Sequence, residues 1–144
     1  MDFSKNTSAG FLVNHMARLF AKTLQSNITD LGLTWGQFPI LIELWEKDGR
    51  TQKELVTRLD LEQATVANTL NRMERDGLVR RVKDPSDGRA QQIWLTEKAK
   101  ALRVPAQAAA KASNTQALAV LTPDEQTQLI ALMKRVIDGF SDAR

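Results

Sequence analysis

One side of the segment formed by residues 63–75 combines amide, short and cationic side chains. At a helical period, the apolar residues Val66, Leu70 and Met73 share the other side. The polar side then carries Gln63, Ala64, Thr65, Ala67, Asn68, Asn71, Arg72 and Arg75. Amides can form paired hydrogen bonds with adenine, short side chains can contact a thymine methyl group, and arginines suit phosphates. The pattern therefore indicates a surface that could lie in a DNA groove, although an ordinary solvated helix face carries the same residue types.

A second chemical signal is an arginine in a predicted turn. Asp84 and Pro85 favour turn initiation and Gly88 permits a positive φ, so the loop can project Arg89 away from the body. An arginine at a hairpin tip suits the narrow minor groove of A·T-rich DNA. Asp87 could pair with the Arg89 side chain and hold it extended. The alternative is a plain surface turn with an incidental ion pair worth roughly 0 to 1 kcal/mol.

Periodicity and end signals predict the elements that position these residues. In chain order they are helices over residues 11–31, 35–47, 52–59 and 63–75 and strands over residues 78–83 and 91–95. Thr34 with Gln37 and Thr51 with Glu54 have capping-box spacing, and Gly77 is placed to end the fourth helix. Two helices separated by a tight break and followed by a hairpin are typical of a winged helix-turn-helix, which places its second helix in the DNA major groove.

The C-terminal part of the chain is also predicted to be helical. Residues 96–121 have a helical pattern that Pro105 interrupts, so a kink or two helices are expected there. Thr122 and Glu125 have capping-box spacing, and the helix that they open is expected to end near Gly139. The residues that this helix is expected to bury are Leu129, Leu132, Met133, Val136 and Ile137.

The two ends of the chain favour a dimer. Residues 8–31 and 96–142 contain more apolar side chains than one small DNA-binding lobe could cover. A second copy of the chain is the expected cover, and packing of both ends within one chain is the alternative. We therefore expect one domain over residues 1–144, with a DNA-binding lobe over residues 34–95 and helical dimerisation regions on either side.

Composition excludes several kinds of chemistry. The 144 residues are 42% hydrophobic and 26% charged, which is typical of one folded domain. Without cysteine and with a single histidine, the chain cannot form a disulfide, a thiol nucleophile or a His-rich metal cluster. It has no Gly-rich phosphate loop or Gly-x-Ser-x-Gly motif, so we expect no enzyme, cofactor or metal. The net charge of +3 permits a nucleic-acid partner, and the polar start and lack of a membrane-spanning run favour a cytoplasmic protein.

A small-molecule site is a further hypothesis. Aromatic residues on the second helix and residues on the first could line a junction between the dimer region and the DNA-binding lobe. The candidates are His15, Met16, Arg18, Trp35, Phe38 and Trp45. Such a site could hold a small aromatic acid whose carboxylate faces His15 or Arg18. Core packing of the aromatic residues and a surface or capping role for His15 are the alternative.

The run GLVRRVKDPSDGRAQQIWLTEKA, at residues 77–99, resembles the wing of MarR-family transcriptional regulators. The pattern of that family is an Asp-x-Arg element followed by Leu-Thr, here Asp87, Arg89, Leu95 and Thr96. The resemblance covers nearly the whole chain. Ala67 departs from it where many relatives carry a hydroxyl, and Ala99 departs where glycine is common.

The resemblance implies a mainly α fold with a two-stranded wing, in which residues 63–75 form the recognition helix and Arg89 enters the minor groove. It implies a homodimeric, ligand-responsive regulator, most often a repressor, on a pseudo-palindromic double-stranded DNA site, with phenolic or related effectors. Two other readings remain open at this point. They are a winged-helix module that binds proteins without DNA, and a small-molecule-binding protein without DNA contacts.

Overall fold

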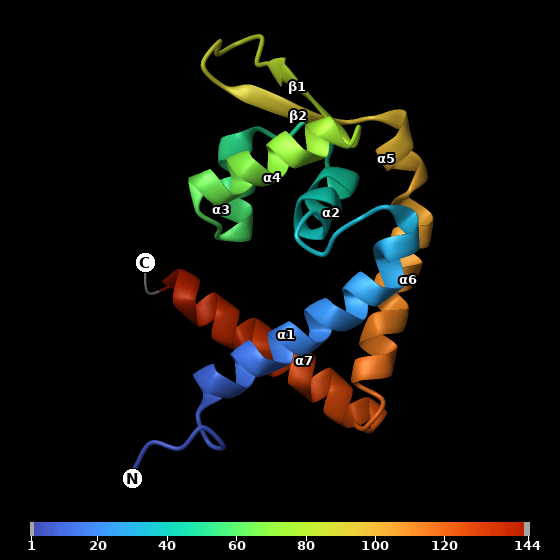
Figure 1. Ribbon diagram of the computed structural model, residues 1–144. Helices are drawn as coiled ribbons and strands as arrows, with labels where there is room; N and C mark the ends of the chain where they lie inside the picture. The colour runs from blue at the N-terminus through green and yellow to red at the C-terminus, as the bar shows by residue number, and fades with distance from the viewer. Residues whose placement is uncertain (1, 143–144) are drawn as a thin grey trace.

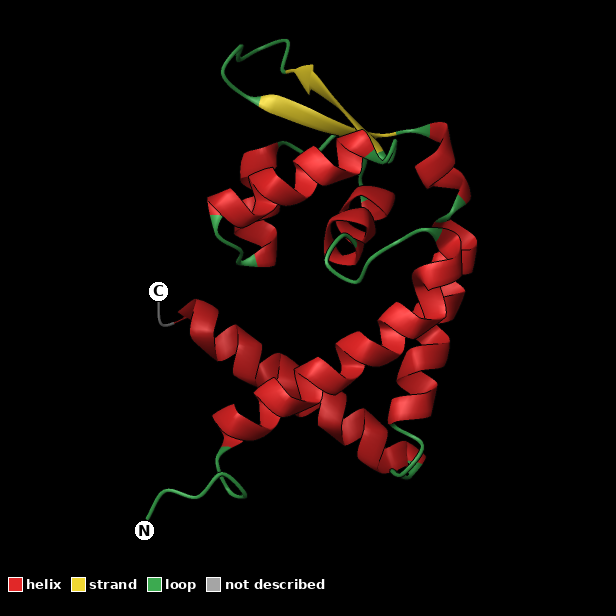
Figure 2. Ribbon diagram, in the orientation of Figure 1, coloured by secondary structure: helices red, strands yellow, loops and turns green. Residues whose placement is uncertain are grey.

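Seven α-helices, one 3₁₀ turn and a two-stranded antiparallel sheet make up residues 2–142, the part of the chain that the computed structural model describes (Figures 1 and 2). The helices are α1 (Ala9–Ile28), α2 (Phe38–Glu46), α3 (Gln52–Leu59), α4 (Gln63–Arg75), α5 (Glu97–Ala101), α6 (Arg103–Ala117) and α7 (Pro123–Asp142). The turn η1 (Thr29–Leu31) follows α1, and the strands β1 (Val79–Lys83) and β2 (Gln91–Leu95) follow α4. The predicted winged arrangement and the mainly helical fold class are confirmed.

The molecule divides into a lobe and a set of long helices. Figure 1 places α2, α3, α4 and the hairpin together at one end, while α1, α6 and α7 extend at the other. Helices α1 and α6 lie side by side, where the Asn27 Nδ2 donates to the Ser113 Oγ at 2.7 Å. The short α5 joins the hairpin to α6 and so connects the two parts.

One apolar core lies within the lobe. The Trp45 indole lies inside this core and donates its N–H to the Ala99 carbonyl at 3.0 Å, so its only polar atom is paired. Fully buried side chains come from α2, α3, α4 and both strands, among them Leu41, Leu44, Leu55, Val66, Leu70, Met73, Val79 and Ile93. The buried residues predicted for α4 are confirmed, which fixes the opposite face of α4 toward solvent.

Local signals define the ends of α3 and α4. The Thr51 hydroxyl and the Glu54 carboxylate form the predicted capping box at the start of α3. Asp60, in the left-handed conformation at φ 53°, ends that helix. Gly77 adopts φ 73° after α4, and the Leu78 N–H donates to the Met73 carbonyl at 2.8 Å. The helix-turn-helix angle is therefore set by residues that lie close together in sequence.

Helix α2 begins at Phe38, so the predicted start at Trp35 was wrong. Half of the predicted capping box is present, because the Thr34 N–H donates to the Gln37 Oε1 at 3.2 Å, but no side chain caps the helix in return. Residues 35–37 form a turn, and Pro39 occupies the first helical turn, where its missing N–H costs nothing.

Pro105 divides the predicted C-terminal segment into two helices, as expected. The junction lies at Leu102, and Pro105 falls in the first turn of α6, where no helical N–H is needed. The Thr122 and Glu125 capping box forms at the start of α7. Helix α7 continues to Asp142, past the predicted end at Gly139.

The predicted burial on α7 was wrong for the single chain. None of its described residues is buried, and Val136 and Ile137 are 62% and 61% exposed. Leu129 is half-buried, while Leu132 and Met133 are exposed. The reason is geometric, because no other element of residues 2–142 covers this face of the helix.

Over residues 2–142, no helix is both long and apolar enough to cross a bilayer. The same residues contain no group of three or more His, Asp or Glu side chains arranged to hold a metal ion.

Candidate nucleic-acid interface

The hairpin is attached to the lobe along β2. The Ile93 N–H donates to the Arg50 carbonyl at 2.8 Å, and the Gly49 N–H donates back to the Ile93 carbonyl at 3.0 Å. The Leu95 N–H donates to the Asp48 Oδ1 at 2.9 Å. The connection between α2 and α3 therefore pairs with β2 in the manner of a short third strand and fixes the base of the wing against the lobe.

Gly49 is required at this attachment. Its φ is +78°, and a Cβ added there would lie 2.5 Å from the Trp94 ring. The left-handed backbone and the close aromatic ring both disfavour any other residue. The exposed tip of the wing is therefore carried on a base that tolerates little change.

The loop between the strands is ordered by short-range hydrogen bonds. The Asp84 carboxylate accepts from the Ser86 N–H at 2.9 Å and from the Ser86 hydroxyl at 2.7 Å, and these bonds lower the pKa of Asp84. The Asp84 N–H donates to the Ala90 carbonyl at 3.0 Å and so closes the loop.

Two expectations about this loop were wrong. The Asp87 carboxylate accepts from the Arg89 backbone N–H at 3.0 Å, and it makes no ion pair with the Arg89 side chain within the described residues. Gly88 is not in the positive-φ region, so the turn does not use its extra freedom. Asp87 thus shapes the backbone, and the guanidinium of Arg89 is exposed, with no ion-pair partner among residues 2–142.

The polar face of α4 lies on the surface as the sequence predicts. Gln63, Ala64, Thr65, Asn68, Asn71, Arg72 and Arg75 are exposed, and Ala67 is half-buried. Among the described residues, the Arg75 guanidinium is the one member of this set in an ion pair, with Asp76 at 3.3 Å. Asp76 also accepts from the buried Gln37 at 3.0 Å, which ties the end of α4 to the start of α2. The assignment of these residues to base and phosphate contacts remains a prediction.

Sequence reasoning did not identify the role of Arg81. Its guanidinium extends from β1 to α4, where the Nη2 donates to the Asn71 Oδ1 at 2.7 Å and to the Ala67 carbonyl at 3.3 Å. Its Nε is buried without a partner in the described part of the chain. The strand pattern marks Arg81 as a cation, but only the packing of β1 on α4 brings it to the recognition surface.

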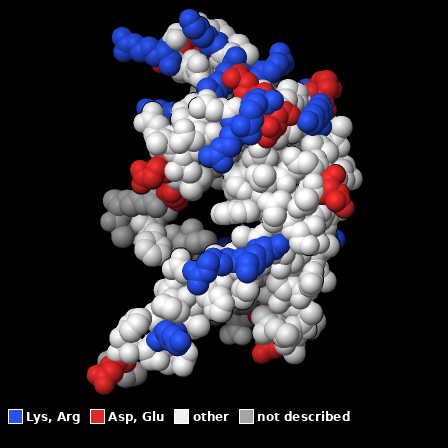
Figure 3. All heavy atoms as spheres, viewed as in Figure 1, with Lys and Arg blue, Asp and Glu red and all other residues white. Residues whose placement is uncertain are grey.

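A groove of about 580 Å³ lies between the starts of α3 and α4 and the wing. Lys53, Lys83 and Arg89 contribute positive charge to it, and Asp87 is the acidic residue among its lining. Figure 3 shows several Lys and Arg side chains at this end of the molecule, interspersed with acidic ones. The groove adds Lys53 on α3 to the residues that could hold a phosphate backbone, which the sequence did not single out.

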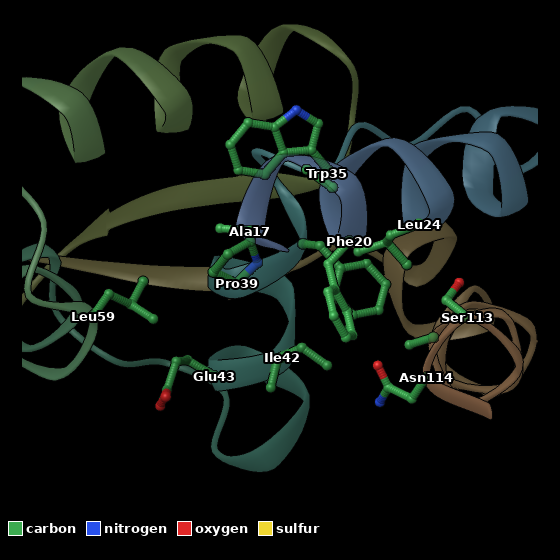
Figure 4. Close-up of a pocket in the computed structure, with 13 residues that line it drawn as sticks. Ala17, Phe20, Leu24, Trp35, Pro39, Ile42, Glu43, Leu59, Ser113 and Asn114 are labelled. Carbon is green, nitrogen blue, oxygen red and sulfur yellow. The ribbon is translucent and has the colours of Figure 1, made fainter. Parts of the chain in front are cut away.

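A second hollow, of about 520 Å³, lies between α1, α2, α3 and α6 (Figure 4). Trp35 and Phe38 line it, as predicted for a ligand site. Its other walls are mainly apolar, from Phe20, Leu24 and Ile42 among others.

The other four residues predicted for this site do not line the hollow. Trp45 is buried behind Phe38, with the two rings edge to face at 5.9 Å. His15, Met16 and Arg18 lie exposed on α1, because the helical period directs Ala17, Phe20 and Ala21 into the hollow instead.

No basic residue lines this hollow within the described chain. Its one acidic residue is Glu43, whose carboxylate in Figure 4 turns away from Phe20 and Ser113. That carboxylate lies 2.6 Å from the Arg58 Nε and 3.5 Å from the Arg50 Nε, and its hydrogen bond raises the pKa of Arg58. The Glu43 carboxylate is thus paired with Arg58 on α3 and with Arg50 in the loop before α3. The lining of the hollow itself is mainly apolar.

Comparison with known proteins relates this chain to a family of transcriptional regulators. The sequence profile of the MarR family matches residues 33–90. The HTH-type transcriptional regulator MgrA of Staphylococcus aureus is 32% identical over 112 residues, which cover 78% of this chain and 75% of MgrA. The HTH-type transcriptional regulator TtmR of Methylorubrum extorquens is 37% identical over 93 residues, 65% of this chain, and that match spans only about half (48%) of TtmR.

A solved structure agrees with the sequence matches. The PcaV transcriptional regulator of Streptomyces coelicolor, in complex with its natural ligand, is 26% identical and superposes with a TM-score of 0.85 over 96% of this chain and 97% of PcaV. These relatives are named as regulators and not as enzymes. With its helix-turn-helix lobe, its wing and its flanking long helices, the chain belongs to the MarR family of transcriptional regulators.

Proposed function

We propose that this chain is a sequence-specific DNA-binding regulator that acts as a homodimer in the cytoplasm. The observation that carries the proposal is the joint exposure, at one end of the lobe, of the polar face of α4 and of the Arg89 guanidinium. The face of α4 lies in the major groove, Arg89 enters the neighbouring minor groove, and Lys53 and Lys83 contact the phosphates between them.

The homodimer accounts for the uncovered apolar faces of the long helices. On α1, Leu12, Met16 and Leu19 are exposed, and on α7 so are Val136 and Ile137. A second copy that covers both faces would remove these side chains from water and place two α4 helices on one duplex. A pseudo-palindromic site follows from the two-fold symmetry.

A gel-shift titration against the chain's own upstream DNA tests the proposal. Binding is expected to weaken steeply as salt rises, because phosphate contacts release counterions. Arg89→Ala is expected to weaken binding by about tenfold or more, the effect of one groove contact. Arg103→Ala removes the same charge from the exposed start of α6 and serves as the control. Binding that is insensitive to both salt and Arg89 would instead support a winged-helix module for protein partners.

The apolar hollow is the effector site of this proposal. Because no basic residue lines it, a neutral aromatic molecule suits it better than the aromatic acid expected from the sequence. Occupation of the hollow, which α2 and α3 share with α1 and α6, changes the spacing of the two lobes and releases the DNA. With a repressor, release would switch transcription on.

Two phenols of similar size, one with an uncharged and one with an anionic substituent, test the effector class. 4-Hydroxybenzaldehyde is expected to raise the melting temperature and to weaken the gel shift, while 4-hydroxybenzoate has the smaller effect. Phe38→Ala in the wall of the hollow should reduce the response to the aldehyde. A stronger response to the carboxylate would overturn the assignment.

A further inference from the structure

Two asparagines, three residues apart on α4, differ in what their amides contact. Both are exposed on the polar face of the helix. The Asn71 Oδ1 accepts a hydrogen bond of 2.7 Å from the Arg81 Nη2. The Asn68 amide makes no hydrogen bond with any side chain or backbone group of residues 2–142. The same side chain therefore stands in two electrostatic settings on one face.

The contact with Arg81 determines which way the Asn71 amide is turned. A guanidinium carries N–H donors and no acceptor, so the amide atom that faces it must be the oxygen. The NH₂ group of Asn71 is then directed away from Arg81. At Asn68 nothing in the described chain fixes the amide, and both of its groups stay available.

The proposed DNA-binding function gives this difference a consequence, and the inference rests on that function. We propose that Arg81 is a positioning residue for base recognition. It holds the Asn71 oxygen toward β1, so that Asn71 presents its NH₂ group to the groove, while Asn68 can present both its oxygen and its NH₂. A paired contact with adenine needs an amide oxygen for N6–H and an amide NH₂ for N7. Asn68 can make this pair. Asn71 instead reads guanine O6 or thymine O4, the acceptors that adenine lacks; N7 is shared by both purines and would not distinguish them.

The position of Arg81 suits this role. It lies in the middle of β1, opposite Ile93, and its side chain is half-buried between the strand and the helix. Its Nη2 also donates to the Ala67 carbonyl at 3.3 Å, one turn before Asn71 on the same side of α4. Its buried Nε has no partner in the described chain, so the contacts of the Nη2 are what hold the guanidinium. The wing thereby influences base reading at a place that its tip never touches.

Selection from a randomised operator library tests the inference, with the full-length chain and four variants. Asn71→Asp keeps an acceptor for Arg81 but turns a second oxygen toward the groove. At one base pair per half-site, the preference should move from guanine or thymine to cytosine or adenine, and affinity for the wild-type site should fall about tenfold or more. The matched control Asn68→Asp should change a different base pair.

Arg81→Met keeps most of the side-chain length but removes the donors. Whatever its effect on overall affinity, it should add adenine to the bases accepted at the Asn71 position, because the freed amide can turn. Arg81→Lys, which retains donors, should restore the wild-type preference. If an Arg81 variant is unfolded under the binding conditions, the comparison of Asn71→Asp with Asn68→Asp provides the test.

The outcomes separate the inference from the function on which it rests. A wild-type chain that enriches no sequence contradicts the proposed DNA binding itself. If the wild type enriches a palindrome but Asn71→Asp weakens all sites equally, Asn71 contacts a phosphate and the inference is wrong. Adenine selected by wild-type Asn71, or equal weakening of all sites by Arg81→Met, also overturns it.

Discussion

The lobe buries its apolar side chains, whereas the long helices leave many of theirs exposed. In the lobe, side chains such as Leu55 and Leu70 are fully buried by neighbours from the same chain. On α1 and α7, side chains of the same chemical type, such as Leu19 and Val136, are exposed. The apolar side chains of the lobe are thus covered by its own chain, whereas the long helices have an apolar face that no part of residues 2–142 covers. Stability and assembly are therefore controlled by different residues.

The largest effect expected from this comparison is on assembly. Val136→Asp places a charge on the uncovered face of α7, where burial of an unpaired carboxylate against a second copy is strongly unfavourable. Light scattering should then give a mass near that of one 16.1 kDa chain, with a circular dichroism spectrum that remains helical. Val104→Asp, on the exposed start of α6, is the control and should leave the dimer intact. If both variants remained dimeric, the exposed face of α7 would not be the dimer interface, and the contrast between the lobe and the long helices would fail.

The next effect is on the stability of the lobe. Leu70→Ala on α4 removes a fully buried side chain and should lower the free energy of unfolding by about 2 to 5 kcal/mol. Urea denaturation measures this change. The comparison variant is Val136→Ala on α7, made in an Ile137→Asp background that is expected to be monomeric. There it should lower the free energy of unfolding by less than about 0.5 kcal/mol, because the Val136 side chain is exposed in the single chain. Similar losses at both positions would show that α7 is buried by its own chain.

A smaller loss is expected at the base of the wing. Gly49→Ala combines a positive φ with a Cβ that meets the Trp94 ring, and it should destabilise the lobe by about 1 to 3 kcal/mol. Gly36→Ala is the matched control, since nothing lies within 4 Å of its added Cβ and its φ is not positive. Thermal melting of the two variants gives the comparison. An unchanged melting temperature for Gly49→Ala would contradict the close attachment of β2 to the lobe.

The smallest effect is confined to the wing loop and depends on pH. The Ser86 hydrogen bonds hold the pKa of Asp84 below its ordinary value of 3.8, so they favour the ordered loop above that pH. As the pH falls through the lowered pKa, the carboxylate gains a proton and the loop loses this support. The protection factor of the Ser86 amide, which is its exchange rate by NMR relative to the intrinsic rate at the same pH, should fall at acid pH while the α4 amides stay protected. Loss of protection in α4 at the same pH would place the effect in the lobe instead.

Much of the fold could be predicted because its signals are local. The Thr51–Glu54 capping box and the glycine at position 77 depend on residues within a few positions of each other, and both form as expected. The apolar stripe of α4 likewise predicted which side would face solvent. The stripe of α7 was equally clear, but periodicity reveals that a face is apolar and not which chain covers it.

The parts of the candidate site that escaped prediction depend on tertiary contacts. Arg81 meets Asn71 only because β1 packs on α4, and Asp87 binds the backbone of Arg89 instead of its side chain because of the shape of the loop. Lys53 joins the groove because the start of α3 lies beside the wing. His15 and Arg18 were misplaced because a difference of one or two positions on α1 turns a side chain away from the hollow.

Dimethyl sulfate footprinting on the selected operator tests the central proposal most directly, because the reagent methylates guanine N7 in the major groove and adenine N3 in the minor groove. Two protected major-groove segments should lie about one helical turn, roughly 34 to 36 Å, apart, as two α4 helices of a dimer require. Minor-groove protection should flank them and disappear in Arg89→Ala while the major-groove protection persists. A single unpaired footprint, or flanking protection that survives the loss of Arg89, would contradict the proposed arrangement of helix and wing on DNA.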